Sequence, residues 1–129
     1  MNPQPTGKLF LIAALFNWLV GTALIIDAPL LLGLLNVTPL PTEPLFVSLS
    51  GWLIICYGIG YYWASRDLAG NLGIIRLGII GKFGVFAVVL VSTLLGHISW
   101  QMNLISGVDL VFAALFIKAI RGSAELLDH

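Results

Sequence analysis

Charge is scarce in this sequence. Its 129 residues include six Lys or Arg and six Asp or Glu, which is 9% of the chain and gives a formal net charge of zero. An ordinary soluble domain carries about 25% charged residues. Because there is no excess of basic residues, the sequence predicts no surface for nucleic acid, and we expect no nucleic-acid partner.

Residues that could bind a metal or take part in catalysis are also few. The one cysteine, Cys56, allows neither an internal disulfide nor a thiolate cluster, and we expect it to be buried as a small apolar residue. Neither of the two histidines has a partner at the spacing of a haem or zinc ligand. No glycine-rich phosphate loop is present. We therefore predict no cofactor, no metal site and no catalytic residue, and an enzymatic role is disfavoured but open.

Apolar residues, in contrast, dominate. They make up 59% of the chain, and the mean hydropathy is +1.03. A chain this short cannot bury so much apolar surface inside a fold that faces water. This composition excludes a soluble globular enzyme and a disordered tail, and it indicates a small integral membrane protein.

Four stretches approach the roughly 20 apolar residues that a membrane helix needs. They cover residues 9–26, 45–64, 72–96 and 104–120. In lipid the backbone must satisfy its own hydrogen bonds, so each stretch is predicted to be a helix. We expect an all-α fold in which residues 1–129 form a single transmembrane domain, an integral membrane four-helix bundle.

The basic residues set the predicted orientation. Five of the six flank the start of the first span, the turn between the second and third spans, or the end of the fourth: Lys8, Arg66, Arg76, Lys118 and Arg121. The other two connections, 27–43 and 97–103, contain no Lys or Arg. By the positive-inside rule both termini are cytoplasmic, in a multi-pass protein of the cell membrane.

Three spans each place a polar residue at one depth. At 1.5 Å per residue, Asn17, Lys82 and Asp109 lie roughly 14–15 Å from the cytoplasmic end, near the middle of a hydrocarbon core about 30 Å thick. An isolated charge there is costly. We predict that Lys82 and Asp109 pair across neighbouring antiparallel helices and that Asn17 adds a hydrogen bond. Snorkelling of Lys82 to the interface is the alternative, although the distance is long for its stem.

Tyrosines of the second span fall on the same side as this polar centre. By helical counting, Ser50, Tyr57 and Tyr61 lie near one face. A tyrosine hydroxyl buried there needs a partner, which the ion pair could supply. The candidate ligand-binding residues are Asn17, Tyr57, Tyr61, Lys82 and Asp109. A purely structural role, in which the polar residues only fix how the helices are arranged, remains the alternative.

The first outer connection is unusual because residues 28–37 are mostly apolar but too short to span. We expect a plain interfacial segment, with a lid over a cavity as the alternative. The four spans also divide into two halves, each an up-and-down helix pair, as in membrane proteins that are built from repeats.

Two stretches resemble a known group of proteins. They are residues 57–67, YGIGYYWASRD, and residues 76–82, RLGIIGK. They resemble small bacterial four-helix membrane proteins of the DoxX-like type, in which an arginine, glycines and a lysine share one helix. The resemblance implies a bacterial inner-membrane location and an association with membrane redox or detoxification complexes. No residue here matches one known to carry chemistry in that group.

Three functions are compatible with these features. The first is binding or transport of a small ligand at the polar centre, where Lys82 binds an anionic or carbonyl group and Asp109 keeps the lysine charged or exchanges a proton. A homodimer could complete such a pathway. The second is a non-catalytic accessory or assembly subunit of a larger membrane complex. An enzyme acting on a lipid-soluble substrate ranks last. Besides such partners, we expect contact with membrane lipid.

Overall fold

Four long helices form the described part of the chain. The computed structural model describes the backbone of residues 5–127 and the side chains of residues 6–122. The helices are α1 (Pro5–Leu34), α2 (Pro44–Arg66), α3 (Leu72–Leu94) and α4 (Met102–Leu127), and a 3-10 turn, η1 (Ala69–Asn71), joins α2 to α3. No strand occurs between residues 5 and 127. Each of the four helices includes a stretch long and apolar enough to cross a membrane, so the all-helical prediction is confirmed.

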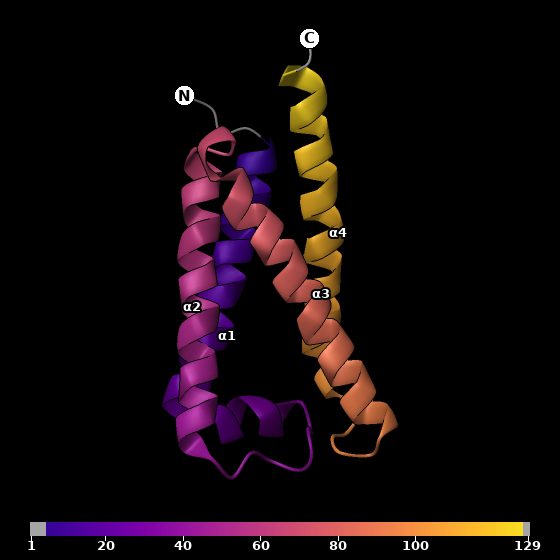
Figure 1. The fold of residues 1–129 in the computed structure, drawn as a ribbon. Coiled ribbons are helices and arrows are strands. Elements are labelled where there is room, and N and C mark those ends of the chain that lie inside the picture. The colour runs from indigo at the N-terminus through magenta and orange to yellow at the C-terminus, as the bar shows by residue number, and fades with distance from the viewer. Residues whose placement is uncertain (1–4, 128–129) are drawn as a thin grey trace.

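The helices are arranged as two pairs. Helix α1 packs along α2 and α3 packs along α4, whereas the two pairs touch each other much less. Figure 1 shows the pairs meeting near the end at which α1 begins and α4 ends, and diverging toward the opposite end, here called the loop end. The predicted division into two up-and-down halves agrees with this arrangement.

Glycines allow α1 and α2 to touch along their backbones. A Cβ atom added to Gly21 would lie 2.5 Å from the carbonyl oxygen of Gly51, and a Cβ on Gly51 would lie 2.6 Å from the carbonyl oxygen of Gly21. A side chain on either residue would force the two helices apart at this crossing. Small residues commonly mediate such close approach between membrane helices, and this contact lets α1 and α2 pack together as one half of the bundle.

Helix α1 extends beyond the predicted span 9–26 and bends at its end. Asp27 has non-helical backbone angles, φ −160° and ψ 77°, and marks a kink. Its Oδ1 accepts a hydrogen bond from the backbone N–H of Leu30 at 3.1 Å, which is the geometry of a helix N-cap. Pro29 is tolerated in the first turn that follows. Asp27 therefore ends the long helix and starts a short one in a new direction.

The segment after the kink, residues 28–38, crosses the loop end, and we call it the strap. Figure 1 shows it beneath the gap between the two helix pairs. Leu32 and Val37 are buried, and the loop before α4 holds the strap's far end: the N–H of Thr38 donates to Ser99 Oγ at 2.8 Å, and the N–H of Ser99 donates to the Thr38 carbonyl at 2.7 Å. The segment therefore packs on the bundle through Leu32 and Val37, while Leu30 and Leu34 stay exposed, and its predicted position at the membrane interface stays a prediction. The lid alternative fits.

The tightly packed core occupies only one half of the bundle. It joins Phe10 and Ala13 of α1, Tyr61 of α2, Ile75 of α3 and Phe116 of α4. All of these residues lie in the half opposite the loop end, where the four helices meet. The expectation that Cys56 is buried is wrong, because this residue is exposed on the outer surface of α2. The core thus holds the pairs together at one end and leaves space between them at the other.

Candidate functional site

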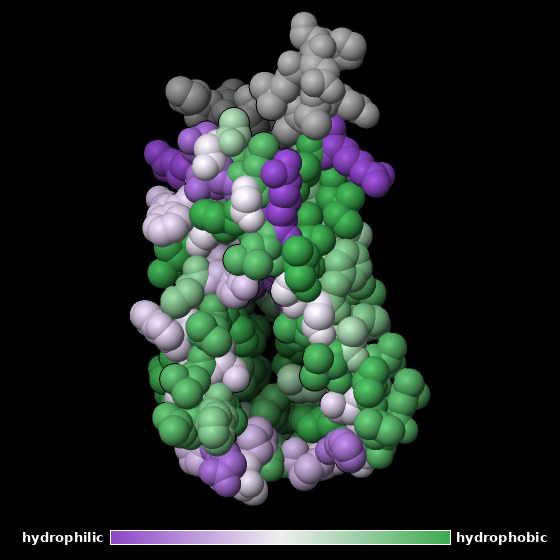
Figure 2. Space-filling view, viewed as in Figure 1, coloured by the Kyte–Doolittle hydropathy of each residue, from purple (hydrophilic) through white to green (hydrophobic). Residues whose placement is uncertain are grey.

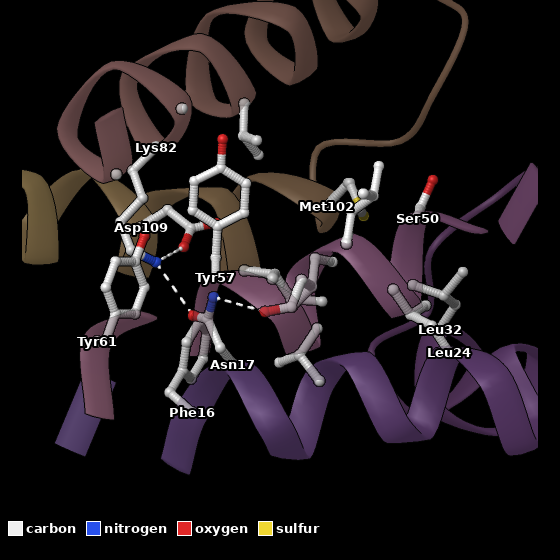
Figure 3. A pocket seen from close by; sticks show the side chains of 17 residues that line it. Phe16, Asn17, Leu24, Leu32, Ser50, Tyr57, Tyr61, Lys82, Met102 and Asp109 are labelled. Carbon is white, nitrogen blue, oxygen red and sulfur yellow. Dashed lines mark hydrogen bonds and ion pairs between the residues drawn. The ribbon is translucent and has the colours of Figure 1, made fainter. Parts of the chain in front are cut away.

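The polar centre joins all four helices. Lys82 Nζ of α3 lies 2.5 Å from Asp109 Oδ1 of α4 and donates to Asn17 Oδ1 of α1 at 3.2 Å. The Asn17 Nδ2 in turn donates to the backbone carbonyl of Ile54 in α2 at 3.0 Å. The ion pair predicted from equal depth is confirmed, and Asn17 supplies the further hydrogen bond. Figure 3 shows the three side chains turned toward one another.

Aromatic rings surround the lysine. Its Nζ lies 5.3 Å from the ring centres of Tyr61 and Phe112 and 5.7 Å from that of Phe16. The negative face of an aromatic ring attracts a cation at such distances. With the carboxylate of Asp109, these rings stabilise a charge that is only 4% exposed. The Lys82 side chain therefore lies inside the bundle and does not extend to its surface, so the snorkelling alternative is wrong.

A glycine on α3 makes room for Tyr61. A Cβ atom on Gly78 would lie 2.7 Å from Tyr61 Cε1 and 2.8 Å from its hydroxyl oxygen. One turn further, a Cβ on Gly81 would lie 3.8 Å from the Tyr57 hydroxyl, which is an ordinary contact. Gly78 is thus the residue that lets α3 pass close to the Tyr61 ring while Lys82 lies beside it.

The expected role of the tyrosine hydroxyls is wrong. Within the described residues neither Tyr57 nor Tyr61 makes a hydrogen bond to the ion pair. Tyr61 meets Lys82 through its ring, and Figure 3 shows the Tyr57 hydroxyl directed away from Lys82. Helical counting placed both residues on the correct face, but it does not determine the direction of a side chain along that face.

A cavity of about 380 Å³ opens beside the polar centre, between the two helix pairs. The five residues predicted to bind a ligand all line it: Asn17, Tyr57, Tyr61, Lys82 and Asp109. The volume lies within the roughly 300–1,000 Å³ typical of ligand sites. The sequence-based residues are therefore brought together around one space.

The cavity extends from this polar end toward the loop end between apolar walls. Leu24 and Leu32 of α1 and Met102 of α4 line its far part, and Figure 3 shows them well separated from Lys82. The lining residues of α2 run from Ser50 to Tyr61, which is roughly 16 Å of helix. The cavity is thus an elongated apolar space with polar groups at one end.

Sequence reasoning missed the contribution of the strap. Leu32 is buried and lines the cavity, although it was expected in an interfacial segment. The signal was present in Asp27 and Pro29, because an N-cap residue followed by proline in the first turn is typical of a helix start. Recognising that start would have predicted a second helical segment rather than a loop.

The cavity is open on the side between α2 and α3. Leu53 of α2 and Val85 of α3 both line it, yet they are 58% and 46% exposed at the surface. Figure 2 shows the hollow between the two halves, bordered by apolar residues. The opening therefore lies at the level of the apolar surface, while the strap covers the loop end.

Several polar groups at the polar end of the cavity have unused hydrogen-bonding capacity in the described part of the chain. The Lys82 ammonium has three hydrogens and donates two hydrogen bonds. The Asp109 carboxylate accepts one of them at Oδ1, and its Oδ2 accepts none from the described residues. No hydrogen bond is present for the hydroxyls of Tyr57 or Tyr61 among residues 6–122. These groups can donate to and accept from a bound molecule. The same residues hold no group of three or more metal-ligating His, Cys, Asp or Glu side chains.

Comparisons with family models, with curated proteins and with solved structures found no match to this chain. The resemblance to DoxX-like proteins therefore stays a prediction.

Proposed function

We propose that this chain is a multi-pass membrane protein, with both termini in the cytoplasm, that binds a small molecule in the cavity between its two helix pairs. The observation that carries the proposal is the cavity itself, because it combines apolar walls with polar groups at one end that have spare hydrogen-bonding capacity among residues 6–122. Ligand sites are mostly apolar with a few placed polar groups that fix orientation.

The membrane location rests on the distribution of surface residues. On the face shown in Figure 2, apolar residues cover the middle of the bundle and hydrophilic ones gather toward its two ends. Arg66 ends α2 and Arg76 lies in the first turns of α3, at the same end of the bundle as the start of α1. This concentration of basic residues supports a cytoplasmic position for that end, in the cell membrane and by resemblance the bacterial inner membrane.

Binding explains more of the site than a purely structural role does. A lysine, a carboxylate and an asparagine suffice to fix how four helices are arranged. They do not require a cavity beside the pair or tyrosine hydroxyls that lack a hydrogen-bond partner within residues 6–122. An accessory role in a larger complex remains the alternative function, and no face of the described helices singles out a protein partner.

The proposal predicts that a molecule dissolved in the bilayer reaches the polar centre. The probe is hexadecanol that carries a photoreactive diazirine two carbons from its hydroxyl, incorporated into lipid nanodiscs with the purified protein. After illumination, peptide mass spectrometry is expected to find adducts on Tyr57, Tyr61 or Asp109. Val20→Trp, which fills the cavity from α1, is expected to reduce these adducts several-fold, because Val20 lines the space.

Leu19→Trp is the matched control. Leu19 is the neighbouring residue on α1 but is 72% exposed, so its tryptophan points to the lipid and is expected to leave the adducts unchanged. If the wild-type protein shows adducts only on outward-facing residues, or if both variants label like the wild type, the cavity does not bind the probe and the proposed function is wrong.

A further inference from the structure

We propose that the ligand is a bilayer-dissolved amphiphile with an uncharged, hydroxyl-bearing head, which rests against Lys82 and Asp109 while its apolar chain fills the cavity toward the strap. This inference rests on the proposed function and adds the chemical class of the ligand.

The charge of the head follows from the ion pair. Lys82 and Asp109 neutralise each other at 2.5 Å, and three aromatic rings already face the ammonium. An anionic head that approached Lys82 would also lie within a few ångströms of the Asp109 carboxylate, and a cationic head that approached Asp109 would meet the lysine. Repulsion between such like charges is strong where water is excluded. A charged head would in addition lose its own hydration. An uncharged head avoids both costs.

The hydrogen-bonding groups point to a hydroxyl. Asp109 Oδ2 can only accept, the third Lys82 hydrogen can only donate, and the hydroxyl of Tyr61 can do either. A hydroxyl both donates and accepts, so it can donate to the carboxylate while it accepts from the ammonium or from a tyrosine. A carbonyl or ether oxygen would leave the carboxylate oxygen without a donor.

The walls and the opening point to a molecule that comes from the bilayer. Leu24, Leu32 and Met102 offer an apolar chain no hydrogen bond beyond the polar end. The strap covers the loop end and is fixed at Thr38 and Ser99. The open side lies between Leu53 and Val85, in the apolar surface where acyl chains would lie. A molecule in the membrane can therefore enter sideways without passing through water.

The test uses photoreactive probes with one hexadecyl chain and different heads. In three probes the hexadecyl chain carries a diazirine two carbons from its head, which is a hydroxyl, a sulfonate or a trimethylammonium group. A fourth probe has no head. The two charged heads keep their charge in any environment. In nanodiscs, at equal probe concentration in the lipid, the alcohol is expected to label the polar centre at least about tenfold more than either charged probe. A short diazirine alcohol, four carbons long and added to the water, is expected to label it weakly.

Variants at the ion pair separate recognition of the head from burial of the chain. In Lys82→Met/Asp109→Leu, the alcohol is expected to lose its advantage over the headless probe, since both charges are replaced by apolar groups of similar size. In Lys118→Met, on the exposed surface of α4, the advantage is expected to persist. The comparison of heads on the wild-type protein stands even if the double variant does not fold.

The outcomes distinguish the two proposals. Equal or stronger labelling by the sulfonate or the ammonium probe overturns the uncharged head while ligand binding stands. Labelling by the headless probe equal to that by the alcohol overturns the role of the hydroxyl. Strong labelling by the short alcohol overturns access from the bilayer. If no probe labels the cavity of the wild type above the Val20→Trp background, the proposed function fails together with this inference.

Discussion

Lys82→Met is expected to destabilise the protein by about 3–5 kcal/mol, the usual cost of removing one partner of a buried ion pair. Methionine fills the space of the lysine stem but leaves the Asp109 carboxylate without its cation, and the Asn17 side-chain oxygen without its donor. All four helices meet through these groups, so the loss affects the contact between the two pairs. Equilibrium unfolding in mixed micelles, followed by tryptophan fluorescence, measures the change.

Two variants control this experiment. Lys82→Met/Asp109→Leu removes both charges, and it is expected to recover most of the lost stability because no uncompensated charge remains. Lys118→Met removes an exposed lysine and is expected to change stability by less than about 0.5 kcal/mol. If Lys82→Met proves no more harmful than Lys118→Met, the pair does not hold the bundle together.

The second large effect is expected from Gly21→Ala, which should cost about 1–3 kcal/mol through overpacking. The new methyl group would lie 2.5 Å from the Gly51 carbonyl oxygen and 2.7 Å from Ile55 Cγ1. A backbone oxygen cannot rotate away as a side chain can, so α1 and α2 must separate. Gly51→Ala should act alike, since its methyl group would meet the Gly21 carbonyl at 2.6 Å. The same unfolding assay measures both losses.

Gly107→Ala provides the matched comparison for these glycines. Gly107 lies within α4, and a Cβ atom there would meet nothing within 4 Å. Alanine favours a helix over glycine by up to about 1 kcal/mol, so this variant is expected to be neutral or slightly more stable. Equal destabilisation by Gly107→Ala and Gly21→Ala would contradict the close contact between α1 and α2.

The sequence predicted the elements that depend on hydropathy and depth. Four apolar stretches were predicted to be helices, on the argument that a backbone in lipid must satisfy its own hydrogen bonds, and each of them corresponds to a helix of the structure. Asn17, Lys82 and Asp109 met because each lies at a similar height on its helix. These are properties of a helix and of a membrane, and both can be read along a single chain.

What the sequence did not predict depends on direction in space. The kink at Asp27 turns residues 28–34 across the bundle. The apolar character of these residues does not distinguish a segment at the membrane interface from one that packs on the bundle. The hydroxyl of Tyr57 points away from Lys82, although its Cα lies on the expected face. The divergence of the helix pairs, which creates the cavity, follows from how all four helices pack and has no signature in any one of them.

The most direct test of the central claim, a neutralised ion pair inside the bundle beside a cavity, is solid-state NMR of the protein in lipid bilayers. Magnetisation transfer from the Lys82 side-chain nitrogen to the Asp109 carboxyl carbon reports whether the two groups touch. With Nζ 2.5 Å from Oδ1, strong transfer is expected, and Asp109→Leu must abolish it. No transfer in the wild-type protein, with a lysine signal that exchanges freely with water, would show that the charges lie apart and that the site does not exist.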